Sequence, residues 1–333
     1  MRRIDSSRRA RARPRAVVAL ALLLACHGRA ESPPARRAFY YWRTTFALSD
    51  GEQRAIAELG VTRLYVRAFD VVWNDKPELA GKLVVQTPFP QVEVVPVVFV
   101  RNDVLAKGQG LAPMISAELH ALGFTGGELQ LDCDWTDKTQ GAFFQLARDL
   151  HATSSTIRLH QVKYRERTGV PPVARGTLMF YNMGKFSADP DNHVIFDAAS
   201  AAKYLDRVSS YPLPLDVALP IWSWVVQIRD DRVIDLLQST DPDELPALDF
   251  VRKDADRFTV TRTAFLHGVL LREGDVLAVE VTGPAEALAA ANMIAPHLPA
   301  VEQPRTVTLF DLSDRNLARH GIPSLDQMFR AVR

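Results

Sequence analysis

The stretch LQLDCDWT, residues 129–136, places two aspartates two positions apart at the end of an apolar run that is typical of a β-strand. Successive side chains of a strand point to opposite faces, so Asp132 and Asp134 should share one face. Two carboxylates on one face repel each other, and the more buried of them should have a raised pKa. One of them is therefore a candidate general acid. A satisfied polar pair, bonded to His160 or Lys163 from the neighbouring strand, fits the same pattern.

Apolar strand-like runs alternate with amphipathic helical segments along the chain, which predicts a parallel sheet covered by helices. The expected strands are 37–43, 63–69, 92–100, 128–133, 156–162, 177–183, 213–222 and 305–313. The expected helices are 50–60, 112–123, 138–152, 198–210 and 284–297. Eight such strands favour a closed (β/α)8 TIM barrel over an open sheet. Segment 223–283 lacks a βα repeat and includes a candidate hairpin at 265–281, so it is predicted to be an insertion after strand seven.

A (β/α)8 barrel carries its chemistry at the carboxyl ends of its strands, and here those ends are rich in aromatic and polar residues. The residues expected there are Tyr41, Trp42, Asp70, Trp73, Arg101, Asp103, Asp132, Asp134, His160, Gln161, Lys163, Tyr181, Asn182, Trp222, Trp224 and Asp311. Aromatic faces stack on sugar rings, and carboxylates and amides hydrogen-bond their hydroxyls. A single tryptophan is more often a core residue, so it is the clustering that predicts a carbohydrate site.

These residues also carry a family resemblance. DCDW at 132–135 resembles the strand-four signature of the chitinases, glycoside hydrolase family eighteen. MFYN at 179–182 is similar to that family's Met-x-Tyr-Asp on strand six, and LDVALPIW at 215–222 to its Gly-x-Pro-x-Tyr on strand seven. The chain also resembles an uncharacterised bacterial family of envelope lipoproteins, known only as a domain of unknown function.

The chitinase resemblance implies substrate-assisted cleavage, in which the acetamide group of the sugar itself attacks. Asp134 would then orient the acetamide and Tyr181 would hydrogen-bond it, with Asp132 as the third member of the catalytic set. The sugar would be bound by the remaining candidates. These are Tyr41, Trp42, Asp70, Trp73, His160, Gln161, Asn182, Trp222 and Trp224.

The chain departs from the family pattern at the position that matters most. The family's acid would fall on Thr136, which cannot donate a proton at useful pH. Leu129 replaces the first aspartate of the motif, Asn182 an aspartate on strand six, and Phe310 a tryptophan on the last strand. The acid is thus either lost or relocated to Asp132, Asp134 or Glu166, the last in a loop expected over the barrel mouth at 160–172.

The amino terminus predicts export. An arginine-rich start is followed by the apolar stretch AVVALALLLA and Cys26, and Leu23, Leu24 and Ala25 match a lipobox. We expect a lipoprotein signal at 1–25, a tether at 26–37 and one barrel domain at 38–333. Cys26 would carry the lipid anchor, and His27 after it favours the outer membrane. An ordinary cleaved signal remains the alternative.

Removing residues 1–25 takes away seven arginines and one aspartate, which leaves 33 basic and 38 acidic side chains. This mildly acidic chain has no basic run for nucleic acid. No phosphate-binding loop, metal-ligand pair or serine-nucleophile elbow is present, so no cofactor or metal is expected. The acidic loops at 189–192 and 239–244 are more typical of solvated turns than of calcium sites.

Three functions fit these residues. The first is an envelope-tethered protein that binds or processes an oligosaccharide or polysaccharide, N-acetylated by the resemblance, in a degenerate chitinase-like site. The second is an active glycoside hydrolase with a relocated acid. The third is a non-catalytic envelope scaffold, which predicts that loops or the 223–283 insertion close the barrel mouth. A sugar site instead predicts an open cleft lined by Trp42, Trp73, Tyr181 and Trp222.

Overall fold

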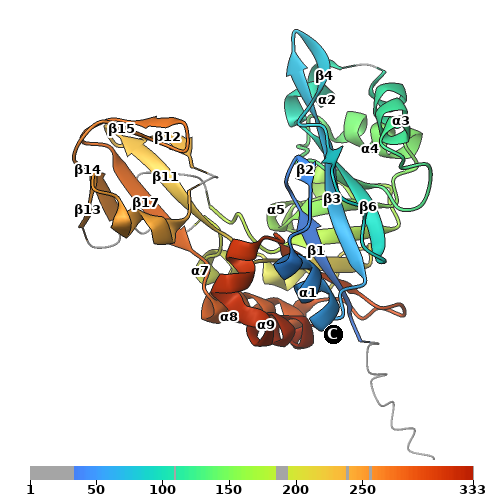
Figure 1. Ribbon diagram of the computed structural model, residues 1–333. Helices are drawn as coiled ribbons and strands as arrows, with labels where there is room; N and C mark the ends of the chain where they lie inside the picture. The colour runs from blue at the N-terminus through green and yellow to red at the C-terminus, as the bar shows by residue number, and fades with distance from the viewer. Residues whose placement is uncertain (1–33, 109, 185–193, 238–239, 255–256, 333) are drawn as a thin grey trace, which may run out of the picture. The chain divides into compact units, whose positions relative to one another are not determined.

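The computed structural model describes residues 34–332 apart from 109, 185–193, 238–239 and 255–256 (Figure 1). The expected signal, Cys26 and most of the tether lie outside the described residues, as does the acidic loop at 189–192. The first strand begins at Arg36, close to the expected start of the domain. No helix in the described part of the chain is long and apolar enough to cross a membrane.

Eight parallel strands close into a barrel in chain order. Closure is shown by β1, which pairs with β3 on one side and with the last strand, β18, on the other. The barrel strands are β1 (Arg36–Tyr41), β3 (Arg63–Asn74), β6 (Glu93–Val100), β7 (Gln130–Asp132), β8 (Ser154–Arg158), β9 (Arg175–Met179), β10 (Leu215–Pro220) and β18 (Thr306–Phe310). The predicted TIM barrel is therefore confirmed.

Short strands extend this framework outside the barrel. Strand β3 continues past the barrel rim and folds back antiparallel onto β4 (Lys76–Ala80). The two-residue strands β2 (Thr45–Phe46) and β5 (Val84–Val85) pair with each other in parallel.

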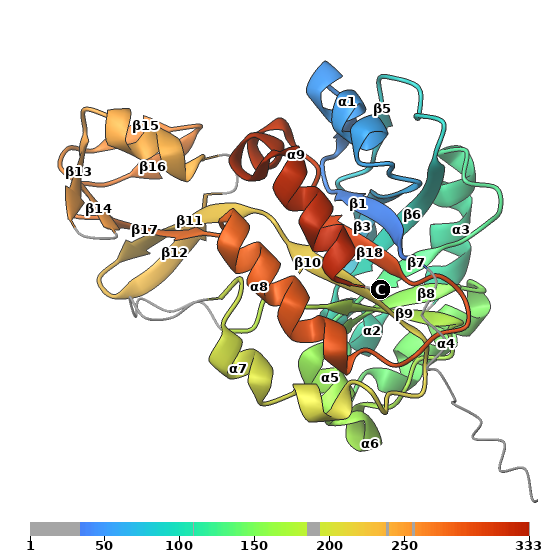
Figure 2. The same cartoon turned by 90° about the horizontal axis from the view of Figure 1, so that it is seen from below.

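Helices accompany the barrel strands, and α8 and α9 run side by side in both views (Figures 1 and 2). The α-helices are α1 (Asp50–Glu58), α2 (Asn102–Lys107), α3 (Leu111–Ala121), α4 (Gln140–Asp149), α5 (Leu159–Lys163), α6 (Arg165–Thr168), α7 (Ala198–Ala202), α8 (Pro284–Ile294) and α9 (Asp314–Ala331). Three 3-10 turns are η1 (Leu205–Arg207), η2 (Pro242–Ala247) and η3 (Ala295–His297).

The loop expected at 160–172 was wrong, because this segment starts as helices α5 and α6. The fifth strand stops at Arg158, whose backbone N–H donates to Oε1 of Gln161 at 2.8 Å. Leu159 and Val162 are buried at helical spacing against the main core, which favours a helix over continued strand.

The insertion after strand seven is confirmed as an all-β unit. Its five-stranded antiparallel sheet has the order β12-β11-β17-β14-β13, and a separate hairpin joins β15 to β16. The strands are β11 (Ser223–Arg229), β12 (Arg232–Leu236), β13 (Val251–Asp254), β14 (Arg257–Val260), β15 (Ala264–Leu266), β16 (Val269–Leu271) and β17 (Val276–Val281).

Alternation along each strand divides the core into layers. Phe39 and Tyr41 belong to the main cluster, shared by the barrel and its helices, whereas Tyr40 belongs to a second cluster inside the barrel. The second cluster continues through Trp222 into Trp224 of β11. The barrel interior and one face of the insertion thus share a continuous hydrophobic cluster.

Candidate active site at the carboxyl end of the barrel

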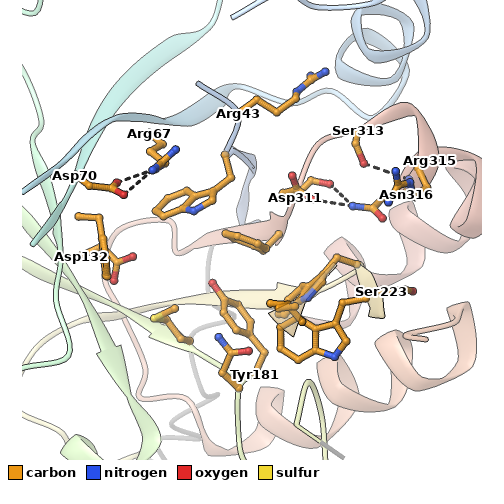
Figure 3. A pocket seen from close by; sticks show the side chains of 18 of the residues that line it. Arg43, Arg67, Asp70, Asp132, Tyr181, Ser223, Asp311, Ser313, Arg315 and Asn316 are labelled. Atoms are coloured by element: carbon orange, nitrogen blue, oxygen red, sulfur yellow. Dashed lines mark hydrogen bonds and ion pairs between the residues drawn. The ribbon is translucent and has the colours of Figure 1, made fainter. Parts of the chain in front are cut away.

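A cavity of about 710 Å³ lies at the carboxyl ends of the barrel strands (Figure 3). This size is typical of small-molecule sites, which run from about 300 to 1,000 Å³. Its lining residues are Trp42, Arg43, Arg67, Asp70, Phe99, Asp132, Arg158, Met179, Tyr181, Asn182, Trp222, Ser223, Trp224, Leu236, Phe310, Asp311, Ser313, Arg315 and Asn316. Asp311, expected at a strand end, is among them, and so are seven of the residues to which a catalytic or sugar-binding role was assigned. These are Trp42, Asp70, Asp132, Tyr181, Asn182, Trp222 and Trp224.

Five aromatic side chains form one connected wall of this cavity. Phe310 is central, with ring centroids 5.4 Å from Trp42, 5.5 Å from Tyr181 and 5.0 Å from Trp222. Trp222 continues the wall to Trp224 at 5.8 Å. Phe310 therefore keeps an aromatic ring on the last strand, where the chitinase resemblance leads one to expect tryptophan.

Asp132 is the last residue of β7 and is only 6% exposed. Among the described residues, its one hydrogen bond comes from the Thr156 hydroxyl at 2.6 Å. Burial, and next the nearby carboxylate of Asp134, raise the pKa of Asp132 to about 6. This agrees with the pKa expected for the more buried of the two aspartates, and it makes Asp132 a proton donor in mildly acidic conditions.

Asp134 lies outside the cavity lining because the strand has already ended at Asp132. Its carboxylate forms a two-pronged ion pair with the Arg158 guanidinium, with N–O distances of 2.6 and 2.9 Å. The aspartates are therefore paired differently from the expected bonds to His160 or Lys163. Arg158 lines the cavity, and its guanidinium is held in place by the ion pair with Asp134, which lies outside the lining.

Asp70 is paired in a similar way. The Arg67 guanidinium donates two hydrogen bonds to it, at 2.8 and 2.5 Å, and both residues line the cavity near Asp132 (Figure 3).

Tyr181 and Asn182 follow β9 and both face the cavity. Burial raises the pKa of Tyr181, and the carboxyl of Asp132 raises it further, so the phenol stays a hydrogen-bond donor. Asn182 has a φ of 54°, in the left-handed region that asparagine tolerates. Its Oδ1 is buried and has no hydrogen-bond partner among the described residues.

Asp311 comes directly after β18, on another part of the cavity wall from Asp132 (Figure 3). Asn316 of α9 donates to its Oδ1 at 2.8 Å and to its backbone oxygen at 2.9 Å. Burial raises the pKa of Asp311 to about 6, against the opposing effect of the Arg43 charge. The cavity thus contains two protonatable carboxyls.

Two of the aromatic predictions do not fit the structure. Tyr41 alternates to the outer face of β1, where its hydroxyl donates to the backbone oxygen of Thr45 at 2.7 Å. Trp73 lies on the extension of β3 beyond the barrel, with the Lys107 ammonium 5.3 Å from its ring. Neither lines the cavity, since one faces outward and the other has passed the rim.

The expected residues of strand five are also displaced, because the chain turns into α5 there. His160 is exposed on that helix, and Gln161 is buried with its Nε2 donating to the backbone oxygen of Trp135 at 3.1 Å. Glu166 on α6 has a side chain that is 69% exposed and does not line the cavity. Thr136 is exposed after β7, with its N–H donating to Thr139.

Several lining residues were missed from the sequence, chiefly Arg67, Arg158, Leu236 and Asn316. For Arg158 a signal existed. It lies two residues after Thr156 in the expected fifth strand, so the same alternation that aligned the aspartates would have placed it inward. Leu236 and Asn316 offered no such signal, since they follow from how the insertion and α9 pack.

The chain is thus a closed TIM barrel with a cavity at the carboxyl ends of its strands. Among solved structures, the chain is similar to the spore cortex-lytic enzyme SleL of Bacillus cereus, with a TM-score of 0.52 and 11% identity over 91% of this chain and 75% of that one. It is also similar to the C-terminal domain of a putative chitinase from Desulfitobacterium hafniense DCB-2, with a TM-score of 0.52 and 11% identity over 90% of this chain and 100% of that one.

At such identities the likeness concerns the fold. No family model matches the chain, and no curated protein matches its sequence. The resemblance to an uncharacterised lipoprotein family therefore stays a prediction.

Proposed function

We propose that this protein processes an oligosaccharide in the cavity, with Asp132 as the acid that protonates the glycosidic oxygen. The observation that carries the proposal is the buried, cavity-lining carboxyl of Asp132 with its pKa of about 6, next to a connected aromatic wall. Glycosidic cleavage requires an acid for the leaving oxygen and a nucleophile for the anomeric carbon. Here Asp132 would be the acid, and the acetamide of an N-acetylated sugar would attack the anomeric carbon as the glycosidic bond breaks, after which water would open the resulting ring. Relatives of the fold include a cortex-lytic enzyme and a putative chitinase, which supports a glycan as ligand.

The geometry favours Asp132 over the other candidate acids. Asp134 is engaged by Arg158, and the side chain of Glu166 is exposed on α6 away from the lining. Asp132 has only a neutral hydroxyl as its hydrogen-bond donor among the described residues. Its proton is therefore not displaced by a direct ion pair.

Tyr181 and Asn182 would hold the sugar beside that acid. The tyrosine hydroxyl stays protonated and can donate to the carbonyl of an acetamide group, and Asn182 lies beside it in the cavity wall. An N-acetylated glycan is therefore the first substrate to test.

Substitution of Asp132 by asparagine tests the assignment. Reducing-end release from an N-acetylated hexasaccharide should fall by about 100- to 10,000-fold in Asp132→Asn, while binding measured by calorimetry is largely kept. Wild-type turnover should decrease as the pH rises past 6, because the acid is then ionised. Asp249→Asn is the matched control, since that side chain is 81% exposed on the insertion.

Glycan binding without turnover is the second candidate. It is favoured by Thr136, which occupies the expected acid position and lies outside the cavity lining. Weak glycan binding by the wild-type protein, with no product at any pH between 4 and 8, would favour binding without turnover over cleavage. Thr136→Glu would not restore cleavage in either case, because position 136 does not line the cavity.

A scaffold role is less well supported. It predicts a closed mouth. Ser223, Trp224 and Leu236 of the 223–283 segment do lie in the cavity wall, but a cavity of about 710 Å³ remains. If no tested glycan binds the folded protein, the scaffold hypothesis would be favoured instead.

The placement of the protein is proposed from its amino terminus. Cys26 would be lipidated and would anchor the barrel to the outer membrane, so Cys26→Ser should release the protein from the membrane fraction or leave it unprocessed. If the variant fractionates and migrates like wild type, the anchor is wrong.

A further inference from the structure

Asp311 contributes a second polar position to the cavity that is separate from that of Asp132. The two carboxyls come from β18 and β7, which do not pair with each other in the barrel. Both line the cavity, and Figure 3 shows Asp70 beside Asp132, with Asp311 next to Asn316 elsewhere on the wall.

The aromatic wall connects these two positions. Phe310 directly precedes Asp311, and its ring contacts that of Tyr181. The pKa of Tyr181 is raised more by the carboxyl of Asp132 than by that of Asp311. A ligand that touches both carboxyls would therefore lie along the rings of Phe310 and Tyr181. The cavity volume of about 710 Å³ is larger than one sugar ring requires.

The Asp311 carboxyl is held in a fixed direction. Asn316 is 3% exposed and donates to Oδ1 of Asp311 at 2.8 Å, and its own backbone N–H donates to the Ser313 hydroxyl that caps α9. Helix α9 thus orients Asn316, and Asn316 orients the carboxyl. Asp311 itself lies directly past the last residue of β18.

We propose that Asp311, positioned by Asn316, binds the hydroxyls of a sugar ring beyond the two that flank the cleaved bond, so that the ligand is an oligosaccharide of at least three rings lying along the aromatic wall. This inference rests on the proposed function. It adds Asp311 as a residue that determines the length of the ligand, whereas Asp132 acts at the bond that is cleaved.

The test compares a short and a long ligand. N-acetylated disaccharide and hexasaccharide are titrated by calorimetry into wild type, Asp311→Asn, Asp132→Asn and the control Asp249→Asn, each shown to be folded by thermal unfolding. Asp311→Asn should weaken hexasaccharide binding by on the order of 10-fold, the effect of a hydrogen bond to a charged group, and should leave disaccharide binding within a factor of about two.

Asn316→Ala provides a second variant, because it leaves the carboxyl in place and removes its support. It should reproduce the selective loss for the hexasaccharide in part. If Asp311→Asn and Asn316→Ala weaken neither ligand, or weaken both equally, Asp311 does not form a separate position and only this inference is overturned. If wild type binds neither oligosaccharide, the proposed function is overturned together with it.

Discussion

Two buried aspartates inside the barrel differ in how their charge is balanced. Asp216, on β10, is 1% exposed and receives two hydrogen bonds from the Arg175 guanidinium, at 3.0 and 2.7 Å, and one from the backbone N–H of Thr306 at 2.7 Å. Asp132, on β7, is 6% exposed and receives one bond from a threonine hydroxyl. Only the first has a direct cationic partner.

Both ends of the barrel have ion pairs, at the carboxyl end Asp70 with Arg67 and Asp134 with Arg158, but in the part of the chain that the structure describes only the carboxyl end also has carboxyls without a cation. At the amino end of β3, Arg63 forms ion pairs of 2.7 Å with both Glu93 and Glu128. At the carboxyl end, Asp132 and Asp311 have only neutral side chains as hydrogen-bond donors among the described residues.

This difference indicates what each carboxyl does. A buried charge that the protein itself neutralises serves the fold, whereas a buried carboxyl with only neutral donors favours its protonated form and is available for chemistry. Burying such a carboxyl costs desolvation free energy, which a protein tolerates where the carboxyl has a functional role. The position of a carboxyl along the barrel is therefore less informative than the identity of its partner.

Breaking the ion pair between Asp216 and Arg175 should have the largest effect on stability. Arg175→Met leaves Asp216 buried without its cation, which should lower the free energy of unfolding by about 3 to 5 kcal/mol. Urea unfolding at pH 7 measures it. Asp132→Asn is the comparison and should cost far less, since asparagine keeps the shape without a charge. Equal losses in the two variants would remove the distinction drawn between these aspartates.

Asp132 and Asp311, which have no direct ion-pair partner within the described ranges, should change the free energy of unfolding by an intermediate amount that depends on pH. The pKa of Asp132 rises from its usual 3.8 to about 6 on folding. The folded protein therefore holds a proton that the unfolded chain has lost, and stability decreases as the pH rises from about 4 to 6. The decrease is on the order of 2 to 3 kcal/mol for Asp132, and Asp311 acts in the same direction.

Comparing variants isolates this contribution. Asp197, Asp275 and Asp326 have lowered pKa values and act in the opposite direction, so the wild-type curve alone is a mixture. The difference between wild type and Asp132→Asn/Asp311→Asn should show the decline, measured by urea unfolding at intervals between pH 4 and 7. A difference that stays constant over this range would contradict the raised pKa values.

The barrel was predictable from sequence because its strands are long apolar runs with repeated spacing. All eight expected strands overlap the observed ones, and the insertion was recognised because the βα rhythm breaks at 223. The boundary of strand five was wrong because local apolar content does not distinguish the end of a strand from the start of a short buried helix. The boundary is marked by the bond between Arg158 and Gln161 and by the burial of Leu159 and Val162 on the helix.

The site was predictable where it follows from alternation within a strand, as for Trp42 and Asp132. It was not predictable where strand ends are irregular. Asp134 follows Asp132 by two residues, yet the strand has ended, so its side chain turns to Arg158. Asp311 was expected at a strand end, but its hydrogen bond to Asn316 depends on how α9 begins, which periodicity does not specify.

The smallest expected effect is a pair of opposite shifts in the acidity of Asp132. The Asp134 carboxylate raises the pKa of Asp132, and the Arg158 charge lowers it. Asp134→Asn should therefore lower that pKa, and Arg158→Met should raise it, each by less than about one unit because the other partner remains. The falling limb of the pH–rate profile, or the titration of the Asp132 carboxyl by NMR, should move to lower pH in the first variant and to higher pH in the second. Shifts of the same sign would mean that the two substitutions act by moving β7 or β8 rather than through charge, and the assignment of Asp132 as a tuned acid would then fail.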